Sequence, residues 1–254
     1  MTKLPETEQK LELINTIDQL SIDKSIKLMI SEQNKGIDSI LPQTNKIKNI
    51  IDLSVKHLKK FKKGRIIYCG AGTSGRIGVQ DGSELYPTFG WPLKRVDYII
   101  AGGFDALVKS VEGAEDDIFS AFRKVEEIKL SHEDLVFCIT ASGNTPFTCE
   151  VSRLAKTKKA LNICISNNKF GKINLLADHS VTLETGAEVI TGSTRLKAGT
   201  SQKACLNIIS SLIMVKFGYV KNGLMTNLVD SNQKLRDRKL RIQSELLHEL
   251  RNKK

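Results

Sequence analysis

Five short apolar runs alternate with longer, more polar segments through the middle of the chain. They span residues 65–69, 96–100, 135–140, 161–166 and 180–183. Runs of this length are typical of strands buried in a sheet, and the segments between them are long enough for crossover helices. The pattern predicts an α/β fold: a three-layer sandwich around a five-stranded parallel sheet.

Helical patterns precede and follow this alternation. They predict an N-terminal helical segment over residues 1–63 packed on the core, an α/β domain over 64–218, and a C-terminal helical segment over 219–254. No linker, repeat or low-complexity tract separates these parts. The apolar stretch 204–217 would expose much of one helix face unless the core or a second subunit covers it.

A glycine-rich loop follows the first predicted strand. Gly70, Gly72 and Gly75 allow a sharp turn, and the backbone amides after them can bind an anion at a helix start. The same spacing is the dinucleotide fingerprint, but the second predicted strand lacks the terminal acidic residue that would bind the ribose of NAD. Thr73 and Ser74 add hydroxyl groups, which suit a compact phosphosugar better than a dinucleotide.

A second loop of similar composition, residues 140–146, follows the third strand. Ser142 and Thr145 supply hydroxyls, Gly143 allows close backbone approach, and Pro146 suits the first turn of a helix. Taken alone, this loop is better explained by an ordinary helix N-cap. Two such loops at the carboxyl edge of one sheet, together with the acidic turn 112–117, favour a phosphate site.

Composition narrows the classes of partner. The chain has 254 residues, is 40% hydrophobic and carries a formal net charge of +11, which favours acidic ligands. The lysines are spread along the whole chain, and the densest cluster, residues 56–65, contains Phe61 as its one aromatic. This cluster lacks the stacking surface of a single-strand binder, so we expect no nucleic-acid partner.

The cysteines and the N-terminus indicate a reducing compartment. Five scattered cysteines lie mostly in apolar runs, and no Cys or His pair has metal-ligand spacing, so we expect reduced core thiols and no metal. The first ten residues lack the apolar core of a signal peptide, and no stretch is long enough to span a bilayer. We therefore expect a cytoplasmic protein with no membrane partner.

Several motifs give the chain a family resemblance. It resembles the N-acetylmuramic acid 6-phosphate etherases, a branch of the sugar isomerase (SIS) domain proteins, with glucokinase regulatory protein as a more distant relative. The matching segments include GAGTSGRIGVQDGSELYPTFG, SVEGAEDD, TASGNTPF, GAEVITGSTRLKAGTSQKA and LMTNLVDSNQKLRDR. The resemblance implies a flavodoxin-like SIS fold for residues 64–218 and a homodimer.

The resemblance also implies an activity, cleavage of the D-lactyl ether of N-acetylmuramic acid 6-phosphate to N-acetylglucosamine 6-phosphate and D-lactate. In the open-chain sugar, the hydrogen on carbon 2 is acidified by the neighbouring carbonyl. A base can remove it, an acid can assist departure of lactate from carbon 3, and water can then add. Two carboxyl groups serve both halves, so we expect no cofactor.

The site residues are carried over from the matching motifs. Glu84 resembles the acid/base that acts on the lactyl oxygen and the incoming water, and Glu115 the group that handles the proton on carbon 2. The division of labour between them stays open, as does a role for Glu188 behind the site. The implied phosphate- and sugar-binding residues are Thr73, Ser74, Ser142, Asn144, Thr145, Ser193, Thr194 and Lys197.

The chain departs from the family pattern at several positions. Gly82 stands in place of an alanine, Leu85-Tyr86 in place of Cys-Pro, and Asn144 in place of an arginine. We expect Gly82 to loosen its helix, because glycine costs up to about 1 kcal/mol relative to alanine. We also expect the C-terminal helical region to be truncated.

Besides the active etherase, a non-catalytic phosphosugar-binding regulator and an isomerase of another phosphosugar stay open.

Overall fold

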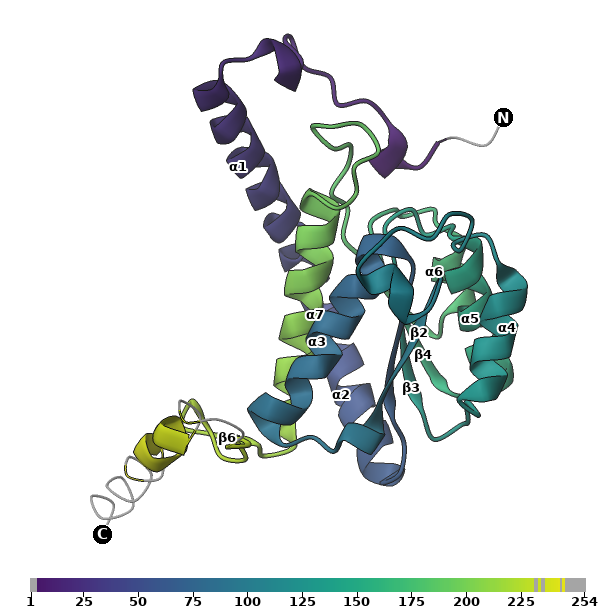
Figure 1. The fold of residues 1–254 in the computed structure, drawn as a ribbon, viewed down its shortest axis with the longest axis vertical. Coiled ribbons are helices and arrows are strands. Elements are labelled where there is room, and N and C mark those ends of the chain that lie inside the picture. The colour runs from purple at the N-terminus through teal and green to yellow at the C-terminus, as the bar shows by residue number, and fades with distance from the viewer. Residues whose placement is uncertain (1–3, 231–232, 234–235, 243, 245–254) are drawn as a thin grey trace.

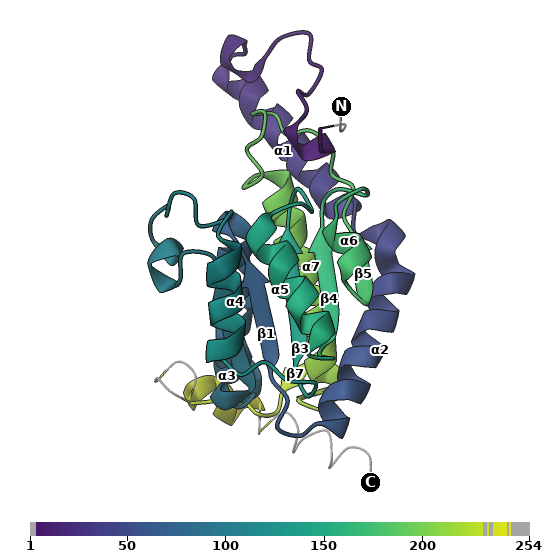
Figure 2. The same ribbon diagram turned by 90° about the vertical axis from the view of Figure 1, so that its right-hand side faces the viewer.

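A five-stranded parallel sheet forms the centre of the protein (Figures 1 and 2). The computed structural model describes residues 4–230, 233, 236–242 and 244. The strands are β1 (Ile66–Gly70), β2 (Val96–Ile100), β3 (Leu135–Thr140), β4 (Leu161–Ser166) and β5 (His179–Thr182). Their order across the sheet is β2-β1-β3-β4-β5. The predicted fold class is confirmed, and each predicted strand lies within one residue of the observed one.

Helices cover both faces of the sheet, which completes the three layers (Figure 2). One face carries α2 (Thr44–Lys60), α3 (Gly72–Phe89) and α7 (Lys197–Lys216), and the other carries α4 (Ile118–Glu127), α5 (Pro146–Thr157) and α6 (Ile173–Leu176). Helix α1 (Ile22–Asp38) packs on α7 and extends beyond the body of the molecule (Figure 1). The short elements are η1 (Glu6–Glu8), η2 (Ile17–Gln19), η3 (Leu41–Gln43), η4 (Leu93–Arg95), η5 (Phe104–Leu107) and the hairpin β6 (Val220–Lys221) and β7 (Leu224–Met225).

The two cores follow from the alternation of side chains along each strand. In β1, Ile66 and Tyr68 join the core under α2, α3 and α7, whereas Ile67 and Cys69 join the core under α4 and α5. Successive side chains of a strand point to opposite faces, so a strand covered on both faces has no polar side. This is why the strands read as continuous apolar runs. Helix α2, which lies in the predicted N-terminal segment, packs into the first core.

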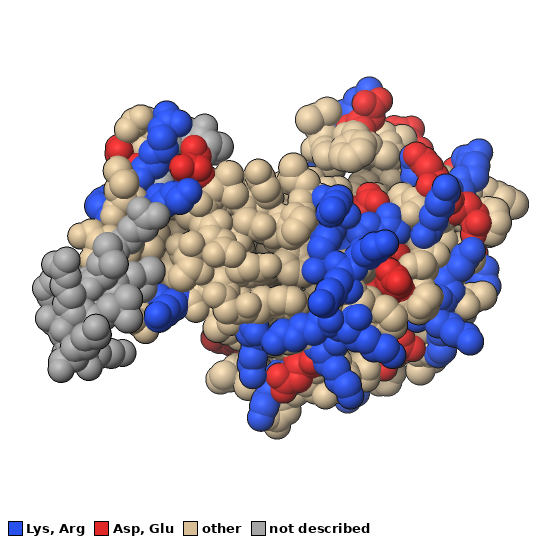
Figure 3. Space-filling model, turned by 90° about the horizontal axis from the view of Figure 1, so that it is seen from below, with Lys and Arg blue, Asp and Glu red and all other residues tan. Residues whose placement is uncertain are grey.

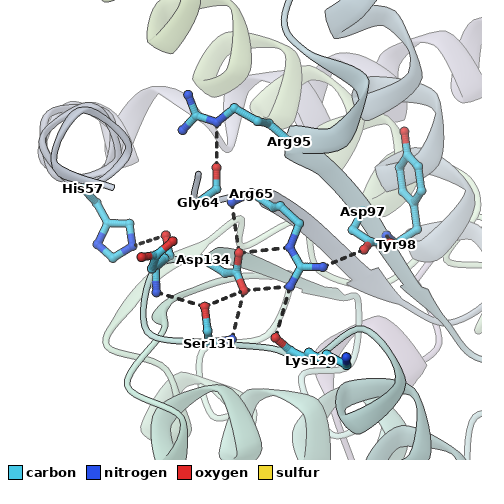
Figure 4. Close-up of polar contacts among 10 residues, drawn as sticks. His57, Gly64, Arg65, Arg95, Asp97, Tyr98, Lys129, Ser131 and Asp134 are labelled. Carbon is cyan, nitrogen blue, oxygen red and sulfur yellow. Dashed lines mark hydrogen bonds and ion pairs between the residues drawn. The ribbon is translucent and has the colours of Figure 1, made fainter. Parts of the chain in front are cut away.

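A partly buried ion-pair network ties the amino ends of three strands together (Figure 4). Arg65, just before β1, donates from Nε and Nη2 to the Asp134 carboxylate at 3.1 and 2.9 Å, and from Nη1 to Asp97 in β2 at 3.0 Å. Burial opposes ionisation of Asp134, but the hydrogen bonds from Arg65 and the Ser131 amide outweigh burial and lower its pKa. The network therefore holds the edge of the sheet opposite the predicted ligand loops.

Basic side chains spread over the face at the amino ends of the strands, with acidic side chains between them (Figure 3). A neighbouring part of the same view shows few charged side chains (Figure 3). All five cysteines are unpaired, and four of them are buried. Among the described residues, no helix is both long enough and apolar enough to cross a bilayer.

Candidate functional site

The carboxyl ends of β1 and β3 lie side by side at the point where the strand connections diverge. From β1 the chain crosses to β2 on one side, while β3 leads to β4 and β5 on the other. In open parallel sheets this switch point forms the crevice that binds ligands. Gly70 pairs in register with Ile139, so the loops that follow the two strands are neighbours. The structure thus brings together the two hydroxyl-bearing loops singled out in the sequence.

Glycine lets the first loop turn tightly into helix α3. A Cβ on Gly70 would lie 2.8 Å from the amide nitrogen of Gly75, and a Cβ on Gly75 would lie 2.8 Å from the carbonyl of Gly70. Strand end and helix start could not approach this closely with larger residues. Gly72, the first residue of α3, has φ +53°, and a Cβ built on it would meet no atom within 4 Å. The start of α3 is therefore available for an anion.

The Ser74 hydroxyl belongs to a buried polar chain behind the loop. Ser74 donates to Gln202 of α7 at 2.9 Å, and Gln202 donates to Asn167 at 2.8 Å. Asn167 in turn donates to Ser201 and Thr185. Ser74 is only 8% exposed, so in this structure its hydroxyl supports the loop from within. Neither Gln202 nor Asn167 was identified from the sequence, because both are remote from Ser74 along the chain.

The second loop is stabilised by its own hydroxyls. Thr140 and Thr145 share a hydrogen bond of 2.9 Å between their hydroxyl oxygens, and the Asn144 amide donates to Ser142 at 3.1 Å. The Asn144 side chain accepts from the amide of Lys172, which joins this loop to the turn after β4. The Gly143 Cα approaches the neighbouring Gly171 closely, leaving no space for a side chain. Loop 140–145 therefore packs against the turn that follows β4.

Glu115 reaches this edge of the sheet from the segment between η5 and α4. Its carbonyl accepts from the Phe147 amide in the first turn of α5 at 2.9 Å, and its side chain is exposed. It lines a cavity of about 230 Å³ with Gly72 and Arg76 of α3. The structure therefore places Glu115 next to the first loop.

Glu84 lies away from the cavity that contains Glu115. It lies 12 residues beyond Gly72 in α3, and is exposed. At about 1.5 Å per residue this separation is about 18 Å along the helix axis, directed away from the carboxyl edge of the sheet. Glu84 is absent from the lining of the cavity that contains Glu115. Within one chain, the structure does not bring the two glutamates together.

The remaining expected residues lie before and within the first turn of α7. Ser193 and Thr194 form a partly exposed turn after Gly192, which has φ +73°. Glu188 is buried and accepts from the amides of Lys197 and Ala198 at 3.2 and 2.9 Å, so it caps α7. Burial raises the pKa of Glu188, although these amides and Lys197 partly offset the effect. Glu188 thus lies behind the turn and holds the start of α7.

The Lys197 ammonium is buried against a carboxylate from the distant helix α1, which was not predicted from the sequence. Its Nζ forms an ion pair with Glu32 of α1, and both side chains are at most 5% exposed. Lys35, one turn further along α1, also pairs with Glu32. No spacing rule could have found this pair, because Glu32 and Lys197 are 165 residues apart. In this structure Lys197 joins α1 to α7 and presents no free charge to a ligand.

Gly82 lies where two tyrosine rings leave no space for a side chain. A Cβ at this position would lie 2.8 Å from the Tyr68 ring and 2.9 Å from the Tyr98 ring and hydroxyl. The Tyr68 hydroxyl donates to Asp81 at 2.7 Å, which fixes the ring. Helix α3 is continuous through Gly82. The glycine therefore accommodates the two tyrosines of the adjacent strands.

We expect Gly82→Ala to destabilise the protein by about 1–3 kcal/mol, because the added methyl group overpacks a fixed aromatic cluster. The free energy of unfolding from urea titration measures the effect. Tyr98→Val combined with Gly82→Ala should recover most of the loss, and Ser83→Ala on the exposed face of the same helix is the matched control. A Gly82→Ala variant at least as stable as the wild type would contradict this packing role.

Comparison with known proteins assigns the fold to a class. The SIS domain family model matches residues 121–212, and the model of the glucokinase regulatory protein N-terminal SIS domain matches residues 46–155. A putative phosphosugar isomerase involved in capsule formation from Bacteroides fragilis superposes with a TM-score of 0.59 at 20% identity, over 80% of this chain and 95% of that chain. An Escherichia coli CFT073 protein in complex with A5P gives 0.58 at 14% identity, over 80% and 97%. The molecule is a SIS-fold protein.

Curated relatives narrow the class to one family. The chain is 41% identical to the N-acetylmuramic acid 6-phosphate etherase of Mycoplasma mycoides subsp. mycoides SC, over 95% of this chain and 79% of the relative. It is 44% identical to that of Oceanobacillus iheyensis, over 95% and 81%. The chain belongs to the N-acetylmuramic acid 6-phosphate etherase family. These relatives favour an active etherase over a non-catalytic phosphosugar-binding regulator.

Proposed function

We propose that this protein cleaves the D-lactyl ether of N-acetylmuramic acid 6-phosphate, giving N-acetylglucosamine 6-phosphate and D-lactate. The proposal is carried by the family match over 95% of the chain, within which Glu84, Glu115 and both hydroxyl-bearing loops are present. The enzyme is a carbon–oxygen lyase of cell-wall amino sugar recycling. We place it in the cytoplasm, as expected from its reduced thiols.

The two loops at the switch point hold the phosphate in this proposal. Backbone amides at the starts of α3 and α5, together with the hydroxyls of Thr73, Ser142 and Thr145, donate to the phosphate oxygens in this arrangement. Asn144 and Ser74 shape the loops from behind, through the hydrogen bonds described above. The Ser193–Thr194 turn adds contacts to sugar hydroxyls. Lys197 contributes through its ion pair with Glu32, which sets the start of α7.

The reaction divides between the two glutamates. Glu115 removes the proton from carbon 2 of the open-chain sugar, and the electron pair forms a double bond to carbon 3 as the C–O bond to lactate breaks. Glu84 donates a proton to the departing lactyl oxygen, then deprotonates the water that adds at carbon 3, while a proton returns to carbon 2. Protons and electrons balance without an external oxidant or reductant, and such positioned acid/base groups contribute about 10²–10⁴-fold each.

A homodimer accounts for the separation of Glu84 from Glu115. Helix α7 contacts α1, α2 and α3, and an apolar groove of about 690 Å³ runs between α1, α2 and α7. Exposed Leu41, Ile208 and Leu212 line this groove. A second copy that covers this side would also meet the exposed face of α3. We therefore propose that Glu84 of each subunit completes the site that contains Glu115 of the other.

The activity is tested by proton NMR of the purified chain with N-acetylmuramic acid 6-phosphate in deuterated water. D-lactate release with deuterium entry at carbon 2 of the product is the expected result. Binding of the phosphosugar without release or exchange would replace the etherase by a binding module. Light scattering at micromolar protein concentration tests the dimer, and a monomeric mass would contradict it.

A further inference from the structure

Arg76 makes an unusual set of contacts beside the candidate site. It lies in the second turn of α3, on the helix that begins at the first loop. Its Nε donates to the carbonyls of Ala106 and Leu107 at 3.0 and 3.2 Å, and its Nη2 donates to the carbonyl of Lys109 at 3.4 Å. All three acceptors belong to the segment between β2 and Glu115.

This segment, residues 104–115, depends on few anchors. Apart from bonds to its immediate neighbours, the described structure bonds it to other elements at two places: through Arg76, and through the Phe147 amide that donates to the Glu115 carbonyl. Phe104 and Val108 are 71% and 88% exposed, so apolar packing holds the segment weakly. Within residues 104–115 only Ala106 is buried, and its carbonyl is one of the acceptors of Arg76.

The two anchors come from the two helices that start at the ligand loops. Arg76 belongs to α3, which follows the first loop, and Phe147 belongs to α5, which follows the second. Arg76 and Glu115 also line the same cavity. We infer that Arg76 is a positioning residue for Glu115: by binding the carbonyls of residues 106, 107 and 109, its guanidinium fixes the segment that carries this glutamate. The inference rests on the proposed function.

Arginine suits this role for a geometric reason. Its planar guanidinium presents several N–H donors in a rigid fork, so one side chain can bind several carbonyls at once. Lysine has a compact ammonium on a flexible stem and cannot reproduce the fork. No ion pair of Arg76 with a carboxylate is found among the described residues, which leaves the guanidinium to the segment.

The kinetic test compares Arg76→Ala and Arg76→Lys with the wild type in lactate release and in deuterium entry at carbon 2. We expect Arg76→Ala to lower both rates together on the order of 100-fold, because a displacement of about 1 Å at a catalytic group has effects of this size. KM should change by less than about threefold, since the phosphate loops are untouched. Added guanidinium should restore part of the rate to Arg76→Ala.

A double variant separates this role from general damage. If Arg76 acts through Glu115, Arg76→Ala should slow the Glu115→Gln enzyme little further, whereas independent effects would multiply. Arg153→Ala, which removes an exposed arginine paired with Glu150 in α5, is the matched control and should leave both rates unchanged. An unchanged turnover in Arg76→Ala, or a loss confined to KM as expected for a direct phosphate ligand, would overturn the inference.

Hydrogen–deuterium exchange of backbone amides provides a readout that does not depend on activity. Residues 104–115 should exchange faster in Arg76→Ala and not in Arg153→Ala. Unchanged exchange there would overturn the inference whatever the rates. Absence of lactate release from the wild-type enzyme would instead contradict the proposed function, so the two failures are distinguishable.

Discussion

A one-to-one mixture of Glu84→Gln and Glu115→Gln subunits should recover lactate release that neither variant shows alone. Each variant by itself should lose about 10²–10⁴-fold in turnover, the range expected when an acid/base group is removed. If Glu84 of one subunit acts with Glu115 of the other, each mixed dimer contains one intact site. With random exchange of subunits, about a quarter of wild-type activity returns, because half of the dimers are mixed and half of their sites are intact.

The same mixture distinguishes the two possible arrangements of the site. A site built from both glutamates of one chain would remain defective in every dimer, so no activity would return on mixing. The experiment needs subunit exchange, which co-expression of two differently tagged chains ensures. Ser83→Ala, which changes the exposed neighbour of Glu84, is a control that should retain wild-type turnover. Absence of recovery in isolated mixed dimers would contradict the shared site.

The buried pair of Glu32 and Lys197 should be a strong determinant of stability. We expect Glu32→Gln to lower the free energy of unfolding by about 3–5 kcal/mol, because it leaves the Lys197 ammonium buried between α1 and α7 without its partner. Lys197→Met should cost less, because Lys35 still pairs with Glu32. Glu32→Leu combined with Lys197→Met should recover most of the loss, since apolar side chains of similar volume often replace a buried pair without cost. Urea titration measures all three variants.

The contribution of this pair should also depend on pH. Burial opposes ionisation of Glu32, but hydrogen bonds and charge interactions with Lys197 and Lys35 outweigh burial, so its pKa lies below the ordinary value of 4.5. A group with a lowered pKa stabilises the fold above its unfolded pKa, and this stability is lost as pH falls through the folded pKa. The difference between wild type and Glu32→Gln should therefore be full near pH 7 and shrink below pH 4.5. A difference independent of pH would contradict it.

The strands were predictable because burial on both faces leaves a direct signature in the sequence. In runs such as 135–140, neither face of the strand meets water, so every position is apolar or small. The loops that follow β1 and β3 were predictable for a related reason. Glycines at positions 70 and 75 are required by a backbone approach that larger residues would block. Local constraints of this kind are visible without a structure.

The relations among distant residues were not predictable in this way. Spacing along the chain says nothing of the Glu32–Lys197 pair, nor of the chain of hydrogen bonds that joins Ser74 to Gln202. Gly82 suggested a loosened helix, whereas the structure shows two tyrosine rings that leave no space for a methyl group. Each depends on which side chains the fold brings into contact.

The sequence alone therefore sufficed for the α/β class, the strand positions, the two hydroxyl-bearing loops and the family resemblance. These features can be recognised from local patterns, because periodicity, turn residues and contiguous motifs each involve only short stretches of the sequence. Only the tertiary structure could show that Glu115 lies at the switch point while Glu84 lies far along α3, and that Arg76 holds the segment between β2 and Glu115. Such distances are set by the packing of helices on the sheet, which no local pattern records.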